Sequence, residues 1–316
     1  MVKFLALRIA AMVGTLLVAS FVVYGAIYLA PGTPLSFLLG GSHGAPPAVI
    51  AAIKAQYHLN DSFLTAYWSW LVGLLHGHFG ESFVQHESVT SLLKPRITTS
   101  LFLVTYAAIL ILVFGIGSGV AAALRPRRLG PVIVTLTTVA MAIPPFVSAV
   151  VLVLLFSVDL AWFPALGNGS GFFGQLYHMT LPAVALALAS VAYISRITSA
   201  AVMDEMSREH VETARARGIR ERRVIRRHVL RNAWIPISTV ATVTVAALIA
   251  GDAVIEVAFG LNGVGAYLVQ SVEDKDYPVV QITVLLLVTI FIVVNMLVDI
   301  GYTLADPRVR LGGRGR

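Results

Sequence analysis

Residues 99–123 read TSLFLVTYAAILILVFGIGSGVAAA, an apolar run without a single Asp, Glu, Lys or Arg. Crossing the ~30 Å hydrocarbon core of a bilayer takes about 20 helical residues. Because backbone N–H and C=O groups find no water in that core, a segment of this kind must satisfy them within its own helix. The run therefore predicts a transmembrane α-helix.

Five further segments have the same character, and the composition agrees with them. Hydrophobic residues make up 57% of the 316-residue chain, and the charged share of 12% is about half of that in soluble domains. The chain has no cysteine, which excludes disulfides, Cys-ligated zinc and iron–sulfur clusters. We predict an all-α polytopic membrane protein with six transmembrane helices, at roughly 9–30, 99–123, 131–157, 179–201, 234–256 and 279–303.

The distribution of positive charge predicts how these helices are oriented. Of the 23 Lys and Arg residues, only Lys54, Lys94, Arg96 and Lys275 fall in connections on one side of the predicted membrane. The positive-inside rule assigns the other side, which carries both termini, to the cytoplasm. The formal net charge of +7 is then explained by membrane topology, and nucleic-acid binding is not indicated.

Three regions follow from this topology: an N-terminal transmembrane helix at 1–30, an external insert at 31–98 and a five-helix core at 99–316. Amphipathic stretches at 46–59 and 63–75 predict helices within the insert. In the core, Gly115 and Gly119 form a small-xxx-small pair that permits close helix packing. Pro144 and Pro145 interrupt the third span.

The connection between the fourth and fifth spans differs from an ordinary loop. Residues 203–233 read MDEMSREHVETARARGIRERRVIRRHVLRNA, which is too polar to enter lipid. Two pairs in it have the spacing of helical ion pairs, Asp204 with Arg208 and Glu212 with Arg215. An apolar face follows, made of Val224, Ile225, His228 and Val229. Because glycine is favoured at the left-handed residue that ends a helix, we predict two short cytoplasmic helices joined by a turn at Gly218.

Within this segment, ETARARG at 212–218, followed by NAWIP at 232–236, resembles the cytoplasmic coupling loop of bacterial binding-protein-dependent ABC importers. Four residues match that pattern: Glu212, Ala214, Gly218 and Pro236. Thr213 stands where the pattern has a second alanine. The resemblance implies that a partner ATPase is contacted by Glu212, Ala214, Arg215, Gly218 and Ile219.

Motifs along nearly the whole chain are similar to those of the bacterial dipeptide/oligopeptide/nickel ABC importer permease family. They are APGTP at 30–34, GLLHGHFGESF at 73–83, DYPVVQ at 276–281 and NMLVDIGYTLADPRVR at 295–310, with Thr33 where the family has Asp. The long insert looks like that of the B-type subunit of a permease pair. The resemblance implies the type I ABC importer permease fold, in the bacterial cytoplasmic membrane.

The same resemblance implies a function and a set of partners. The chain would form the translocation pathway for di- or oligopeptides and couple it to ATP hydrolysis elsewhere. Expected partners are a C-type permease, two ATP-binding subunits or one fused ATPase, and an external peptide-binding protein. Two alternatives stay open: a permease of the same family for nickel or another small solute, and a stand-alone secondary transporter in which 203–233 is only a basic loop.

We expect no catalytic residue, cofactor or metal site in this chain. A phosphate-binding loop needs Gly-Lys-Ser/Thr, and no lysine of the sequence follows a glycine. ATP and Mg are therefore expected in the partner ATPases. His76 and His78 have the spacing of a chelating pair, but solvated loop histidines are the simpler interpretation.

Three polar residues in the last two spans are candidates for the translocation pathway: Asp252, Glu256 and Asn295. A charge at the bilayer centre costs about 2.5–3.5 kcal/mol, so such residues face protein or a water-filled cavity. Glu256 and Asn295 match the family pattern, whereas Asp252 stands where the family often has glycine. Hydrogen bonding between helices is the alternative interpretation.

Overall fold

The computed structural model describes residues 2–29 and 62–305, and nearly all of them are helical. Within these two ranges the only β-type pairing is an isolated bridge between Glu81 and Ser88. The predicted helix at 46–59, the APGTP motif and the end of the chain after Ala305 lie outside the described residues. The prediction of an all-α protein is confirmed.

Five of the six predicted spans are found in the described residues as helices long and apolar enough to cross a membrane. The third predicted span is a bent pair of helices, which makes a sixth span if the two halves cross together. In chain order they are α1 (Val2–Leu29); α5 (Val89–Leu110) with the π-helical η1 (Ile111–Gly115) and α6 (Ile116–Leu124); the pair α7 (Gly130–Ala142) and α8 (Pro145–Leu152) with η2 (Val153–Asp159); α9 (Gly171–Met206); α11 (Glu221–Val224) with η3 (Ile225–Val229) and α12 (Leu230–Ala258); and α14 (Tyr277–Ala305). Three shorter helices complete the set: α4 (Phe63–Leu75), α10 (Glu209–Ala216) and α13 (Val264–Glu273).

The third span breaks where the two prolines stand. Helix α7 ends at Ala142, Ile143 is extended with φ −88° and ψ 118°, and α8 begins at Pro145. The axes of the two halves differ by 106°. Proline lacks the N–H that would continue the helix and disfavours helical geometry in the residue before it, which places the break at this point.

The described residues divide into two compact units, one made of 2–29, 62–98 and 263–296, the other of 99–262 and 297–305. In the first unit, α4 packs against α1. The hydroxyl groups of Ser20 and Tyr67 are 2.8 Å apart. Aromatic rings meet along the same contact, Phe21 and Tyr24 of α1 with Phe63, Tyr67 and Trp70 of α4.

A buried carboxylate organises the rest of the first unit. Asp276, just before α14, accepts hydrogen bonds from the hydroxyl of Ser82 and from the backbone N–H of Phe83, the latter at 3.0 Å. Asp276 and Ser82 are both 2% exposed. The guanidinium of Arg96 lies 3.7 Å from the ring centre of Tyr267 on α13. The Asp276 contacts tie segment 76–88 to the start of α14, and the Arg96–Tyr267 contact ties α5 to α13.

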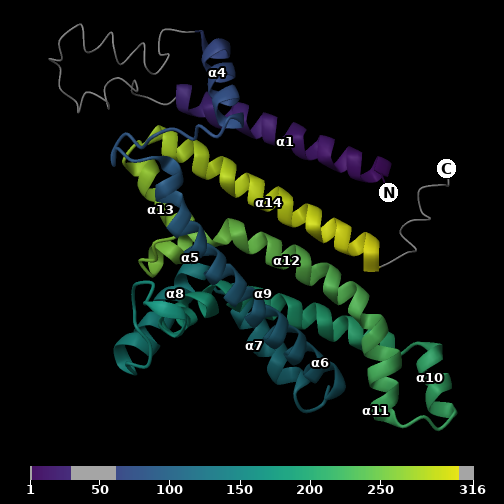
Figure 1. Ribbon diagram of the computed structural model, residues 1–316. Coiled ribbons are helices and arrows are strands. Elements are labelled where there is room, and N and C mark those ends of the chain that lie inside the picture. The colour runs from purple at the N-terminus through teal and green to yellow at the C-terminus, as the bar shows by residue number, and fades with distance from the viewer. Residues whose placement is uncertain (1, 30–61, 306–316) are drawn as a thin grey trace, which may run out of the picture. The chain divides into compact units, whose positions relative to one another are not determined.

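Helix α9 is the centre of the second unit. It packs against α6, α7, α8 and α12 (Figure 1). Half of its most apolar window is buried, compared with 6% for α1. The close packing of Gly119 is confirmed, because a Cβ added there would lie 2.4 Å from the carbonyl oxygen of Ser195 on α9.

Candidate functional site: the α10 segment

Helix α10 lies with α11 beyond the adjoining ends of α9 and α12 (Figure 1). A helix rises 1.5 Å per residue, so α9, which is 36 residues long, measures about 54 Å and exceeds the ~30 Å hydrocarbon core. Its polar end therefore projects from the membrane and carries α10 with it. This is the segment for which the sequence predicts contact with a partner.

The ends of α10 follow from its sequence. Acidic Glu209 and Glu212 lie in its first turn and basic Arg215 in its last, which complements the helix dipole. At the other end the N–H of Ile219 donates to the carbonyl of Ala214 at 3.2 Å, and Gly218 donates to Arg215 at 2.9 Å. This is a Schellman motif, and Gly218 has φ +74°, as the left-handed residue in that motif requires. The predicted helix stop at Gly218 is confirmed.

One face of α10 is buried and the other is exposed. Val211 and Ala214 are 0% and 4% exposed and join an apolar cluster with residues of α9, α11, η3 and α12. Glu212, Arg215 and Gly218 are exposed, and Ile219 is half-buried at the edge of the cluster. Of the five predicted coupling residues, Ala214 therefore packs within the chain, and the exposed three are those that a partner can reach.

Arg215 has a different partner from the one its spacing predicts. Its Nη2 and Nε atoms donate to the two carboxylate oxygens of Glu221 at 2.8 and 3.1 Å. The Gly218 turn brings the start of α11 back beside α10, so Glu221 displaces Glu212 as the ion-pair partner. The hydrogen bond to Glu221 raises the pKa of Arg215 above its ordinary value. The other predicted pair, Asp204 with Arg208, is confirmed at 2.9 Å.

The prediction of two separate short helices is half right. Helix α10 is short, but the residues after the turn form α11 and η3, which continue without a break into α12. Val224 and Val229 are both fully buried, although they are five residues apart. The π-helical hydrogen bonds of η3 run from i to i+5 and place both side chains on one face. The predicted apolar face exists, as an extension of the fifth span.

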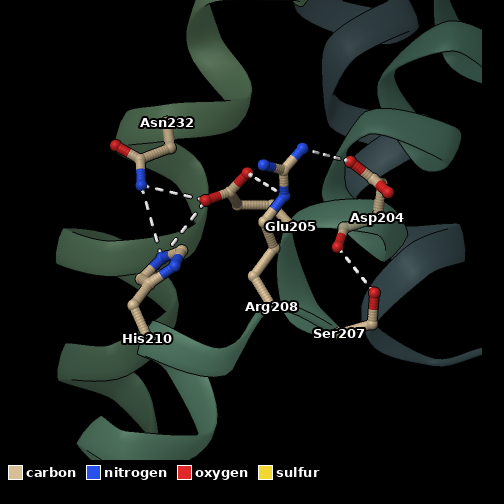
Figure 2. Close-up of polar contacts among 6 residues, drawn as sticks. All are labelled: Asp204, Glu205, Ser207, Arg208, His210 and Asn232. Atoms are coloured by element: carbon tan, nitrogen blue, oxygen red, sulfur yellow. Dashed lines mark hydrogen bonds and ion pairs between the residues drawn. The ribbon is translucent and has the colours of Figure 1, made fainter.

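Sequence reasoning missed Glu205, which lies on the last turn of α9 (Figure 2). Its Oε1 accepts a hydrogen bond from Nδ2 of Asn232 at 2.9 Å and lies 3.2 Å from Nε2 of His210. Its Oε2 lies 3.5 Å from Nε of Arg208. Glu205 follows the buried Val202 by three residues, which puts a carboxylate on the buried face of α9. That periodicity was the signal available in the sequence.

The structure places two of the three pathway candidates in the interior of the chain. Asp252 and Glu256 are 2% and 0% exposed. Glu256 accepts a hydrogen bond from the hydroxyl of Ser100 on α5. The side chain of Asn295 lies outside the described residues. A role of Asp252, Glu256 and Asn295 in translocation stays a prediction.

Comparison with known proteins decides the family. A family model described as "Binding-protein-dependent transport system inner membrane component" matches residues 111–311. The chain belongs to this family. The model of the N-terminal part of such membrane components matches residues 1–104. The chain is therefore a membrane-embedded permease component of a binding-protein-dependent transport system, as the motifs predict.

Similar curated proteins match over almost their full length. The chain is 36% identical to the oligopeptide transport system permease protein OppB of Salmonella typhimurium over 312 residues, which are 98% of this chain and 100% of the relative. It is 33% identical to the glutathione transport system permease protein GsiC of the same species over 314 residues, 98% and 99% of the two chains. A putative peptide transport system permease protein of Brucella abortus is 34% identical over 307 residues, 96% and 97% of the two chains.

The fold is also similar to that of a solved transporter. The inward-facing methionine ABC transporter MetNI has a chain that aligns with a TM-score of 0.58 and 18% identity, over 69% of this chain and 97% of that chain. At this identity the likeness concerns the fold alone. It confirms the ABC importer permease fold expected from the motifs.

Proposed function

We propose that this chain is one of the two permease subunits of an ATP-driven peptide importer, and that α10 docks on a partner ATPase. The cargo is inferred from relatives named for oligopeptide, glutathione and peptide transport, which match from end to end. In this proposal both termini and α10 face the cytoplasm. A second permease, the ATPases and an external binding protein complete the importer, and ATP and Mg belong to the ATPases.

The docking proposal rests on the difference between the two faces of α10. On the apolar face, Val211 and Ala214 pack against other helices of this chain. Glu209, Glu212 and Arg215 are exposed on the opposite face, beyond the membrane spans. A helix anchored on one side and charged on the other suits a polar, reversible contact that changes during each ATP cycle.

The connections of α10 suggest how movement reaches the membrane. Ser207 and Arg208 alone separate it from α9, and a short turn at 217–220 leads to the continuous α11–η3–α12 helix. A displacement of α10 by closure of the ATPases would pull on both spans at once. Tilting these spans would then open the pathway alternately to either side.

A charge reversal on the exposed face tests the docking. Glu212→Lys should abolish co-purification of the ATPase subunits with the affinity-tagged permease, and with it peptide uptake by whole cells. Glu273→Lys is the matched control, because Glu273 is also exposed but lies on α13, outside this segment. Retention of ATPase and uptake in the Glu212 variant, at the level of the Glu273 variant, would refute the docking site.

A further inference from the structure

Glu205 is the one acidic residue of segment 203–233 that the structure buries. Its side chain is 11% exposed, whereas that of neighbouring Asp204 is 69% exposed. A carboxylate taken out of water needs hydrogen-bond donors or positive charges around it to offset the lost hydration. The position of those donors shows what the buried group connects.

The groups in contact with the carboxylate come from three different parts of the segment. Asn232 belongs to α12, His210 to the first turn of α10, and Arg208 to the joint between α9 and α10. The amide of Asn232 also lies 3.4 Å from Nε2 of His210, so the two groups at Oε1 contact each other, while Arg208 lies at Oε2 (Figure 2). One side chain of α9 thus binds α10 and α12 together.

The polar contacts of Glu205 are directional, whereas those of the apolar cluster are not. Burial of Val211 and Ala214 holds α10 against the chain, but hydrophobic contact is non-directional and tolerates sliding. Hydrogen bonds to a charged group weaken steeply away from their preferred geometry. The contacts of Glu205 therefore set the orientation of α10 relative to both spans.

We infer that Glu205 is a positioning residue that locks α10 to α9 and α12, so that the three helices move as one body. This rests on the proposed docking of α10, because a rigid connection matters only if an external force acts on that helix. Glu205 itself need not contact the ATPase. Without it, α10 would rotate on its apolar cluster, and ATPase closure would move α10 without moving α12.

The absence of cysteine from the chain makes a direct test simple. Spin labels on Arg217→Cys and Arg231→Cys, both exposed, report the distance between the end of α10 and α12 by pulsed electron paramagnetic resonance. The measurement uses the complete importer, first without nucleotide and then trapped with ATP and vanadate. In the otherwise unaltered chain we expect one narrow distance distribution that is the same in both states.

Glu205→Ala should broaden that distribution by about twofold and make it differ between the two states, because the shared acceptor of the network is gone. Glu205→Gln keeps an oxygen for Asn232 and should lie between the two. Asp204→Ala, on the same turn but solvent-exposed, is the control and should leave the distribution unchanged. Asn232→Ala added to Glu205→Ala should cause no further broadening, because the hydrogen bond between Asn232 and Glu205 is already lost in the single variant.

The inference is overturned if Glu205→Ala gives the narrow distribution of the unaltered chain, or if Asp204→Ala broadens it equally. A Glu205→Ala chain that fails to insert is replaced by Glu205→Gln and Asn232→Ala, and normal distributions in both would also overturn it. If α10 does not dock on the ATPase, the spin-label experiment gives a different result. The label on α10 would then keep its mobility when ATPase subunits are added, while the effect of Glu205→Ala would persist in the permease alone.

Discussion

Replacing Gly119 by alanine adds a methyl group where α6 lies in close contact with α9. The new Cβ would lie 2.4 Å from the Ser195 carbonyl oxygen and 2.6 Å from Cβ of Thr198. Ordinary van der Waals contact begins at 3.4 Å. The obstacle is backbone as well as side chain, so a rotamer change cannot relieve it, and the helices must separate by about 1 Å.

The cost follows from two opposing effects. Overpacking of a well-packed site costs about 1–3 kcal/mol. Alanine in place of a glycine within a helix stabilises the folded state by about 0.5–1 kcal/mol. The two ranges give a net loss for Gly119→Ala centred near 1 kcal/mol and at most about 2.5 kcal/mol, and 1 kcal/mol is a factor of about 5 in the ratio of folded to unfolded protein. The sign depends on the packing, because propensity alone would make the variant more stable.

Alanine variants at two other glycines of the same stretch serve as comparisons for the stability of Gly119→Ala. A Cβ on Gly117 would meet nothing within 4 Å, so Gly117→Ala keeps the propensity gain without a clash. Gly115 is intermediate, with Ile194 side-chain atoms at 3.0 Å. The apparent melting temperature in detergent, followed by loss of the monodisperse chromatographic peak, should fall in the order Gly117→Ala, Gly115→Ala, Gly119→Ala. Equal stability of the Gly117 and Gly119 variants would refute the close approach of α6 and α9.

Four shorter predictions concern the loops and the buried acids. Gly218→Val should abolish peptide uptake, whereas Gly218→Asn should retain most of it, because asparagine tolerates the left-handed conformation better; equal loss in both would show that the backbone conformation is not the reason. A cysteine in place of Ser170 should react with a membrane-impermeant maleimide in intact cells, and one in place of Arg128 only after permeabilisation; the reverse result would invert the proposed orientation. Asp276→Ala leaves the Ser82 hydroxyl and the Phe83 N–H without their acceptor and should cost about 1–3 kcal/mol, seen as faster proteolysis within 76–88; unchanged cleavage would contradict the tie. Asp252→Asn tests the predicted pathway role against the burial of Asp252 in the chain: ATP hydrolysis preserved with a greater loss of uptake for basic than for acidic peptides would support that role, and an equal loss for both classes would indicate a structural one.

The spans were predictable because lipid imposes one rule on every segment that crosses it. An apolar run of sufficient length must be a helix, so 99–123 and its counterparts could be placed from composition alone. Local rules also predicted the break at Pro144 and the turn at Gly218. Each depends on the backbone chemistry of one residue type and on no distant partner.

What the sequence did not disclose depends on contacts across turns. The pairing of Arg215 with Glu221 requires the Gly218 turn to fold back, whereas helical spacing alone favours Glu212. Asn232 follows Glu205 by a whole helix and two turns, so no periodic pattern connects them. The continuation of α11 into α12 depends on η3, and no local propensity distinguishes a π-helical turn from an α-helical one in this stretch.

The sharp bend between α7 and α8 has an electrostatic consequence. A helix that stops leaves its last carbonyl groups without N–H donors of its own and carries roughly half a negative charge at that end. For α7 these are the carbonyls of 139–142, at the break between two apolar helices. Hydrocarbon would penalise each bare carbonyl by several kcal/mol, so this end of α7 must meet water, protein or a bound cation. The bend thus marks a point where an apolar part of the chain has polar surroundings.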